Sequence, residues 1–384
     1  MSAKVRDILE ASVTEGHAPG MVALVGRGDA AEVEAVGQLA FEAGAPMRPD
    51  AIFRIASMTK PITAVATLML IEDGALALDE PVDRLLPELA NRRVLRRVEG
   101  PIDETVPAIR PITLADLLTF RMGLGILFGG PEQYPILRPI AERDLAGFGP
   151  PNPEHDYGPD EYMRRLGELP LMAQPGERWL YTAPSNVLGV LVARASGQSF
   201  PDFLRARIFE PLGMPDTSFF APPAKLDRLT TAYLPTPSGL QRASADYTVP
   251  PRFPEGDAGL VSTASDVFAF SRFMLRRGLA ASGRRLLSEA SVAAMTRDHL
   301  TAEQREGGAM ILGPIQGWGY GLAVRLARSP EGVSAGAYGW NGGRGTSWLM
   351  DPGSDTTAVL LTQRGFDSPD PPPWHKAFWQ AVFG

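Results

Sequence analysis

Ser57 and Lys60 are the residues whose types and spacing could do chemistry most directly. They stand three positions apart, so on a helix the hydroxyl and the amine share one face within hydrogen-bonding reach. A serine hydroxyl is a weak nucleophile until a neighbouring group takes its proton. A lysine amine can take it where burial disfavours the charged form. The pair therefore predicts nucleophilic attack by Ser57 with Lys60 as the base.

The surroundings of Lys60 strengthen this interpretation. Only four of the 37 basic residues are lysines, and arginine could not replace Lys60 because it does not give up its proton. Residues 58–70 are apolar at helical spacing with almost no polar face, which predicts a buried helix with Ser57 at its N-terminal end. That end favours developing negative charge. A serine three residues before a lysine also arises by chance about once or less in such a chain, so a structural role stays open on spacing alone.

Other catalytic systems find little support in the sequence. The chain has no cysteine, which excludes disulfides, thiolate metal sites and a cysteine nucleophile. No G-x-S-x-G motif is present, and the four histidines are not spaced as zinc ligands. We expect these histidines to be structural or surface residues, and we expect neither a metal nor a cofactor; they are His17, His155, His299 and His375.

The order of the expected helices and strands along the chain indicates how Ser57 is positioned. Residues 5–13 read as a helix and residues 21–41 as a β-hairpin, while the last third of the chain carries further β-rich runs and a terminal helix. Strands at both ends with helices between them imply one sheet assembled from both termini. We expect an α/β (α+β) fold, with residues 1–80 and 225–384 forming the α/β domain. Residues 81–224 should form a mainly helical domain that contains a lid-like loop at 125–160.

Composition limits the partners. The 384 residues are 44% hydrophobic and 21% charged, with a formal net charge of -7, which argues against a nucleic-acid partner. The short basic runs at 92–93, 96–97 and 284–285 are expected to be solvated helix faces. The first twenty residues have no apolar signal core, and no stretch reaches the roughly 20 apolar residues of a membrane span. We expect a soluble cytoplasmic protein without a membrane partner, and its oligomeric state stays open.

Six blocks in the same order resemble class C β-lactamases, penicillin-binding proteins and above all family VIII carboxylesterases. The resemblance covers most of the chain and implies a serine β-lactamase-like fold, in which an antiparallel sheet is flanked by helices and joined to an all-helical lobe. The blocks are IFRIASMTKPITAVATLMLIEDGALALDEPV, ITLADLLTFRMGL, PGERWLYTAPSNVLGVLVARASGQSF, IFEPLGMPDTSF, GLVSTASDVFAFSRFML and YGWNGGRGTSWLMDP.

The resemblance implies roles for individual residues. Ser57 looks like the acylated nucleophile and Lys60 like its partner. Tyr181 looks like the tyrosine that shuttles protons in this family, although by itself it would be read as a core aromatic residue. Trp340-Asn341-Gly342 stands where relatives have K-T-G, and the next amide, that of Gly343, should form the oxyanion hole with the amide of Ser57.

Two departures from the β-lactamase pattern favour the esterase branch. Trp340 replaces the lysine that helps bind the carboxylate of penicillins, and Ala183 replaces an asparagine that contacts the β-lactam side chain. Asn186 is expected to face the start of its helix instead. Both replacements remove polar contacts and leave an apolar slot. Phe120 also stands where relatives often have histidine, which carries no inference.

The expected function is therefore a serine carboxylesterase that hydrolyses small, short-acyl-chain esters through an acyl-enzyme, with at most weak cephalosporin turnover. The alternatives are a β-lactamase or D-amino-acid peptidase, and a catalytically inactive binding relative. The expected partner is a small-molecule ester. Bulky residues suggest the walls of its pocket, which we expect to be Trp340, Gly342, Phe128, Tyr134 and Phe148.

Overall fold

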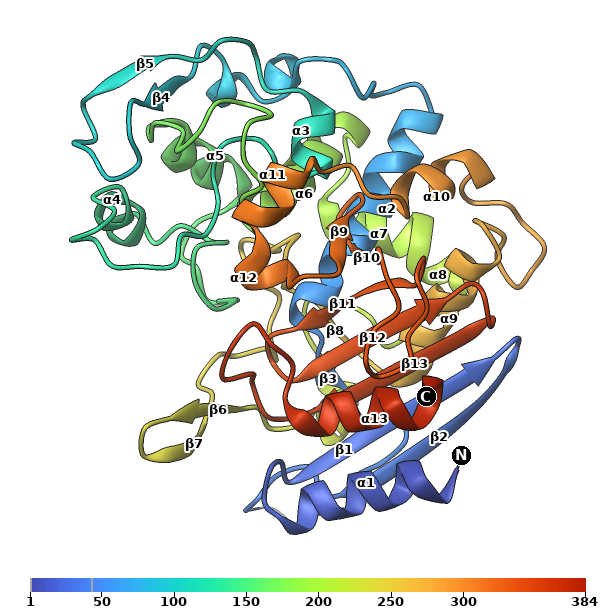
Figure 1. The fold of residues 1–384 in the computed structure, drawn as a ribbon. Helices are drawn as coiled ribbons and strands as arrows, with labels where there is room; N and C mark the ends of the chain where they lie inside the picture. The colour runs from blue at the N-terminus through green and yellow to red at the C-terminus, as the bar shows by residue number, and fades with distance from the viewer. Residues whose placement is uncertain (1, 43) are drawn as a thin grey trace.

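A seven-stranded antiparallel sheet forms the centre of the computed structural model, which describes residues 2–42 and 44–384 (Figure 1). Its strand order is β2-β1-β13-β12-β11-β10-β9, so the first hairpin pairs with the last strand. The sheet assembled from both ends of the chain is thereby confirmed. Its strands are β1 (Gly20–Arg27), β2 (Ala30–Gly37), β9 (Gln316–Trp318), β10 (Ala323–Arg325), β11 (Tyr338–Gly342), β12 (Thr346–Asp351) and β13 (Thr356–Thr362).

Strand β13 shows why the sheet is covered on both faces. Successive side chains of a strand point to opposite faces, and every residue of β13 is buried. Ala358 and Leu360 pack with helices α1 (Ala3–Thr14) and α13 (Pro373–Phe383), whereas Val359 and Leu361 belong to the main core on the other face. Figure 1 shows α1 and α13 together beside the strands of both termini.

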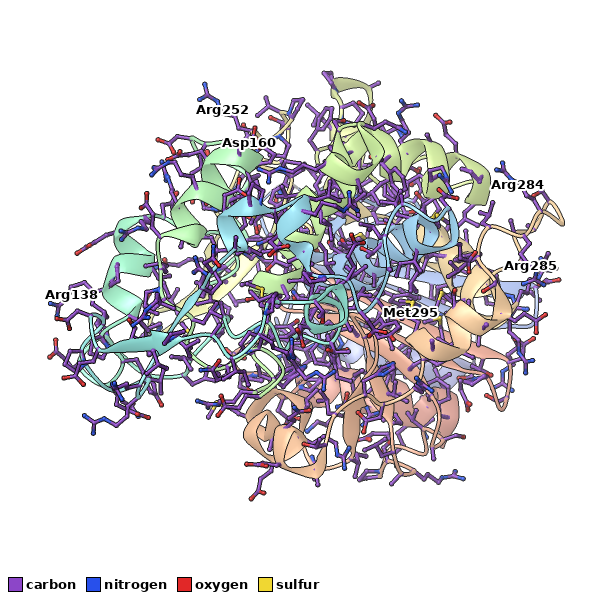
Figure 2. The ribbon with its side chains drawn as sticks, turned by 90° about the horizontal axis from the view of Figure 1, so that it is seen from above. Arg138, Asp160, Arg252, Arg284, Arg285 and Met295 are labelled. Atoms are coloured by element: carbon purple, nitrogen blue, oxygen red, sulfur yellow. The ribbon has the colours of Figure 1, made fainter. Side chains whose placement is uncertain are left out.

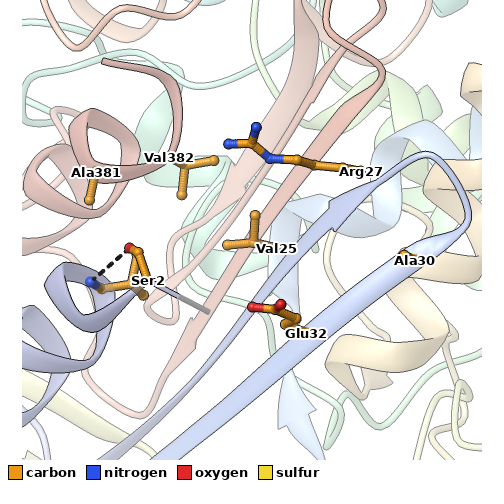
Figure 3. A pocket seen from close by; sticks show the side chains of 8 residues that line it. Ser2, Val25, Arg27, Ala30, Glu32, Ala381 and Val382 are labelled. Atoms are coloured by element: carbon orange, nitrogen blue, oxygen red, sulfur yellow. Dashed lines mark hydrogen bonds between the residues drawn. The ribbon is translucent and has the colours of Figure 1, made fainter.

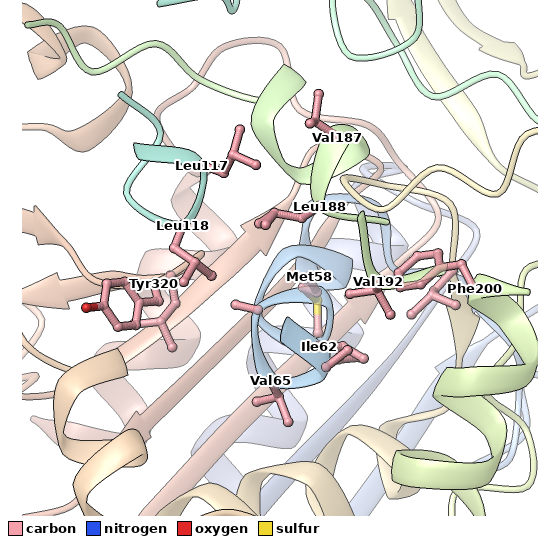
Figure 4. Packing of buried hydrophobic residues seen from close by; sticks show 14 of the residues in the cluster. Met58, Ile62, Val65, Leu117, Leu118, Val187, Leu188, Val192, Phe200 and Tyr320 are labelled. Carbon is pink, nitrogen blue, oxygen red and sulfur yellow. The ribbon is translucent and has the colours of Figure 1, made fainter. Parts of the chain in front are cut away.

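Helix α2 (Thr59–Glu72) runs through the main core, with its first twelve residues buried. Its apolar residues pack against α3 (Leu114–Leu118) and α6 (Ala183–Ser196), as Figure 4 shows for Ile62, Val65 and Leu188. A helix that is apolar on all sides must be enclosed, which is what the sequence predicts for this segment. Gly74, at a φ of +74°, allows the chain to leave the helix.

Most of the remaining helices and strands are short, and α9 (Ala264–Leu275) is the longest of these helices. The expected loop at 125–160 contains one of these helices, so it is only partly irregular. The helices are α4 (Leu137–Glu142), α5 (Pro159–Gly167), α7 (Phe200–Leu204), α8 (Glu210–Leu212), α9 (Ala264–Leu275), α10 (Glu289–Met295), α11 (Ala302–Gly307) and α12 (Ala309–Leu312). Three strand pairs complete the fold: β3 (Phe53–Arg54) with β8 (Val261–Ser262), β4 (Arg93–Leu95) with β5 (Thr105–Pro107), and β6 (Tyr233–Thr236) with β7 (Gly239–Arg242).

None of the three basic runs lies on a helix, in contrast to the expectation for residues 92–93, 96–97 and 284–285. Arg284 and Arg285 project from the surface, as does Arg138, whereas Met295 lies inside (Figure 2). Arg92 by contrast is buried, and the run at 92–93 lies at a strand and not on a helix. The Arg92 guanidinium donates hydrogen bonds to backbone carbonyls at the C-terminal end of helix α5, those of Gly167 and Leu169. The expected helix setting is therefore wrong for all three runs, and the expected exposure is wrong for Arg92, because the end of α5 offers it unpaired carbonyls.

Within residues 2–42 and 44–384, the helices are too short or too polar to cross a bilayer.

Candidate active site

Ser57 lies in a single turn of 3₁₀-helix, Ala56–Met58, between strand β3 and helix α2. Ala56 has a φ of +44°, a left-handed conformation that is strained for a residue with a Cβ. The Thr59 hydroxyl donates to the carbonyl of Ala56 at 2.7 Å and accepts from the amide of Leu260 at 3.2 Å. These bonds tie the strained turn to the segment that leads into β8, so Ser57 is held rigidly.

Lys60 and Ser57 meet as their spacing predicts. The Lys60 Nζ donates a hydrogen bond of 2.9 Å to the Ser57 Oγ, and the Lys60 side chain is fully buried. The same Nζ donates to the backbone carbonyl of Asp257 at 2.9 Å and lies 3.8 Å from a carboxylate oxygen of that residue. The amine therefore lies between the Ser57 hydroxyl and the Asp257 segment, enclosed by protein.

Tyr181 lies beside the same amine. The Lys60 Nζ is 4.5 Å from the centre of the Tyr181 ring. Thr182, the next residue, has a φ of +81° and donates a hydrogen bond to the carbonyl of Gly147. Non-glycine residues in left-handed conformations thus flank both Ser57 and Tyr181, which is common where a structure holds functional groups in fixed positions.

Trp340, on strand β11, provides more than an apolar wall. Its indole Nε1 donates a hydrogen bond of 2.5 Å to the Tyr181 hydroxyl oxygen. The replacement of the family lysine therefore leaves a hydrogen-bond donor at Tyr181, which sequence reasoning missed. Trp340 and Tyr181 belong to an aromatic cluster that also contains Phe120, Trp179 and Trp318.

The turn after β11 lies directly against the segment that carries Ser57. A Cβ on Gly342 would come within 2.2 Å of the Ile55 carbonyl oxygen, and Thr346 Oγ1 donates to that oxygen at 3.2 Å. Gly343 faces open space, and it lines the same cavity as Ser57. The two amides expected to form the oxyanion hole therefore belong to residues that line the same cavity.

The cavity above Ser57 has a volume of about 320 Å³ and mainly apolar walls. Of the residues expected to line it, Phe128 and Trp340 do so, whereas Gly342, Tyr134 and Phe148 do not. Tyr134 and Phe148 are partly buried against the main core instead, and Gly342 is enclosed by the turn that it helps to form. Sequence reasoning missed several wall residues, which come from distant segments: Ile126, Met310, Ile311, Leu312 and Phe366.

The start of the expected lid is fixed to the site. The Ile126 amide donates to the Tyr181 carbonyl at 3.0 Å. A Cβ on Gly125 would lie 2.5 Å from the same carbonyl oxygen, so only glycine permits this close approach. This contact places the side chains of Ile126 and Phe128 on the cavity wall.

Behind Lys60 lies a buried polar cluster that sequence reasoning also missed. Asn186 does not simply face the start of its helix, because its Oδ1 accepts a hydrogen bond of 3.1 Å from the Asp257 amide. Glu255 and His155 are buried nearby, with His155 Nε2 3.5 Å from the Glu255 carboxylate and His155 Nδ1 2.7 Å from that of Asp144. In the sequence, the two acidic residues on either side of Gly256, in PEGDAGL, were the feature that could have predicted this cluster.

The charges of this cluster are coupled. Burial raises the pKa of Glu255 to about 7, and the adjacent Asp257 carboxylate adds to that rise, while the hydrogen bond from His155 opposes it. Burial works against a charged His155, but its hydrogen bonds to Glu255 and Asp144 outweigh that effect and raise the pKa of His155. His155 is thus a buried partner of two acids, and it does not line the cavity.

A second cavity, of about 200 Å³, lies between the β1–β2 hairpin and the two terminal helices (Figure 3). Arg27 and Glu32 line it together with Ser2, Val25 and Val382. Among the described residues, no lysine, tyrosine or histidine lines this cavity. It therefore lacks the paired nucleophile and base found at Ser57 and Lys60.

Comparisons with known proteins agree on one family. The family model described as Beta-lactamase matches residues 5–381. Protein Rv1367c of Mycobacterium tuberculosis is 34% identical over 371 residues, covering 94% of this chain and 88% of its own length. Esterase EstB of Burkholderia gladioli is 32% identical over 394 residues, with 96% and 91% covered. Among solved structures, EstCE1, a hydrolase with promiscuous acyltransferase activity, superposes with a TM-score of 0.82 at 25% identity, covering 99% of this chain and 98% of its own.

Proposed function

This chain belongs to the Beta-lactamase family, and on that premise we propose that it is a serine carboxylesterase that cleaves small esters through an acyl-enzyme on Ser57. The observation that carries the proposal is the 2.9 Å hydrogen bond from Lys60 to Ser57 beside an apolar cavity. A nucleophile in contact with a group that can accept its proton is the arrangement that acyl transfer requires.

The reaction has two steps. The Ser57 Oγ attacks the ester carbonyl carbon, and its proton passes to Lys60 and Tyr181. The amides of Ser57 and Gly343 bind the oxyanion of the tetrahedral intermediate. The bond to the alkoxy oxygen then breaks, and the alcohol leaves with the proton. In the second step, water attacks the acyl carbon, gives its proton to the same groups, and releases the carboxylic acid as Ser57 regains its hydrogen.

The residues around Ser57 favour an ester over a β-lactam. Trp340 cannot bind the carboxylate of a penicillin as a lysine would, and its Nε1–H is already directed at Tyr181. Ala183 is buried in helix α6 and has no polar group for a β-lactam amide. The volume of about 320 Å³ is at the lower end of ligand pockets, which favours short acyl chains. The name of the relative EstB as an esterase points the same way.

The direct test compares p-nitrophenyl butyrate with nitrocefin, using wild type and Ser57→Ala. We expect clear butyrate hydrolysis, weak or no nitrocefin turnover, and a loss of at least about a thousandfold in kcat for Ser57→Ala. Nitrocefin turnover that exceeds ester hydrolysis would establish the β-lactamase alternative. A wild-type protein that neither hydrolyses esters nor reacts with a fluorophosphonate probe would be an inactive binding relative.

A further inference from the structure

Asp257 lies against the buried side of Lys60, away from the cavity. Its backbone carbonyl accepts a hydrogen bond from Lys60 Nζ at 2.9 Å, and its carboxylate Oδ2 lies 3.8 Å from the same nitrogen. The side chain is buried, and its Oδ1 has no hydrogen-bond partner within the described residues. Asp257 does not line the cavity, so a substrate bound there has no access to it.

The backbone around Asp257 is clamped between helices α2 and α6. Thr63 Oγ1 on α2 donates to the Gly256 carbonyl at 2.7 Å, and the Asp257 amide donates to Asn186 Oδ1 on α6 at 3.1 Å. A Cβ on Gly256 would lie 2.4 Å from the Ser185 carbonyl oxygen, so the segment packs tightly on α6. The position of the Asp257 carboxylate relative to Lys60 is therefore set by two helices.

Other titratable groups also lie near Asp257. Glu255 accepts a hydrogen bond of 2.8 Å from the amide of Asn152 and faces His155, which also contacts Asp144 at the surface. The hydroxyls of Tyr162 and Tyr247 are buried nearby, and the Asp257 charge helps to raise the pKa of each, after the larger effect of burial. The charges of Arg344 and Arg54 oppose that rise in the pKa of Tyr247. The imidazole is thus the partner of Glu255, which leaves Lys60 as the cation paired with Asp257.

We infer that Asp257 is a positioning residue that acts through Lys60: its carboxylate stabilises the ammonium form and its carbonyl aims the amine at Ser57. This inference rests on the proposed function, in which Lys60 must give up its proton to act as a base. A negative charge within 4–6 Å of an amine favours the charged form. Removal of the Asp257 charge should therefore change the pH dependence of the reactions of Ser57 that depend on Lys60.

The test removes this charge and follows the pH dependence of two reactions. Asp257→Asn keeps the shape of the side chain and removes its charge. If that variant does not fold, Asp257→Ser removes the charge with a smaller side chain. For each variant, kcat/KM for p-nitrophenyl butyrate and the rate of Ser57 labelling by a fluorophosphonate are measured from pH 5 to pH 9. We expect the acidic limb of both pH profiles to shift to lower pH by about one unit. At a given pH on that limb, the rate of the variant, divided by its own plateau rate, should then be about tenfold higher than for wild type.

Asp266 provides a matched control. It is a buried aspartate at the start of helix α9, where it accepts hydrogen bonds of 2.8 Å from Thr217 Oγ1 and from the Asp216 amide. Asp266→Asn should lower thermal stability and leave the acidic limb unmoved.

Two outcomes would overturn the inference in distinguishable ways. If Asp257→Asn and Asp257→Ser lower both rates equally at every pH, Asp257 has only a structural role, while the proposed function stands. If the wild-type protein neither hydrolyses the ester nor labels at Ser57, the proposed function fails and the inference fails with it.

Discussion

The indole Nε1 of Trp340 donates a 2.5 Å hydrogen bond to the hydroxyl oxygen of Tyr181, so strand β11 and the segment before helix α6 meet at the proposed proton shuttle. This bond places a neutral donor where relatives of the β-lactamase branch have an ammonium group. A donor at the phenol oxygen stabilises negative charge on that oxygen and fixes its direction. It therefore assists transfer of a proton from Tyr181 without adding a charge to the cavity.

Removal of this donor should lower kcat. Trp340→Phe keeps an aromatic ring but loses the N–H, and we expect kcat to fall about 10- to 100-fold. A loss of this size corresponds to the free energy of one hydrogen bond to a charged group. Steady-state kinetics with p-nitrophenyl butyrate will measure this effect. Trp318 is the control, because it lies in the same aromatic cluster and its Nε1 has no partner within the described residues. Equal losses for Trp340→Phe and Trp318→Phe would attribute the effect to packing.

Lys60→Arg should be almost as damaging as loss of the nucleophile. Arginine keeps a positive charge beside Asp257 but does not release its proton at neutral pH. We expect kcat to fall about 100- to 10,000-fold, the usual contribution of a general base. Lys225→Arg is the matched control, because Lys225 pairs with Asp216 at 2.8 Å, away from the cavity. Activity retained in Lys60→Arg would show that the site needs only the charge.

Phe128 should limit the length of the acyl chain. Its side chain lines the cavity and is still 46% exposed, so it forms part of the rim. Phe128→Ala should raise the ratio of kcat/KM for p-nitrophenyl octanoate to that for the butyrate about tenfold. Phe148→Ala, at a bulky residue that does not line the cavity, should leave this ratio unchanged. The opposite pattern would place the acyl group elsewhere.

His375 should make the fold sensitive to acid. It is buried, with Nδ1 2.9 Å from Ser347 Oγ, and burial lowers the pKa of His375 to about 3. An unfolded histidine titrates near 6.5, so between about pH 6.5 and pH 3 the unfolded state binds the extra proton. The stabilising contribution of the neutral ring is complete above about pH 6.5. It decreases by about 1.4 kcal/mol for each pH unit below that value.

Urea unfolding at pH 7 and pH 5 measures this contribution. The free energy of unfolding should decrease from pH 7 to pH 5 in both proteins. The decrease should be about 2 kcal/mol smaller in His375→Gln than in wild type. His299→Gln is the comparison, because burial lowers the pKa of His299 as well but its ring is only partly buried. An identical pH dependence of unfolding for wild type and His375→Gln would show that His375 does not cause the sensitivity to acid.

The sequence alone determined the features that depend on nearby residues. The hydrogen bond between Ser57 and Lys60 follows from helical spacing, and the burial of α2 follows from its apolar pattern on every side. Alternation in the first hairpin and β-rich runs in the last third of the chain likewise predicted strands near both termini, and with them the single sheet. The importance of Tyr181 did not follow from such a pattern, and it came only from resemblance to a family.

Only the tertiary structure decided which distant residues meet at Ser57. Asp257 reaches Lys60 from a segment 197 positions away, and Trp340 reaches Tyr181 across 159 positions. The same cause made Tyr134 and Phe148 wrong as pocket residues, because their segment folds back onto the main core. Periodicity reports which face of an element is buried, whereas the identity of the neighbour on that face depends on how all the elements pack together.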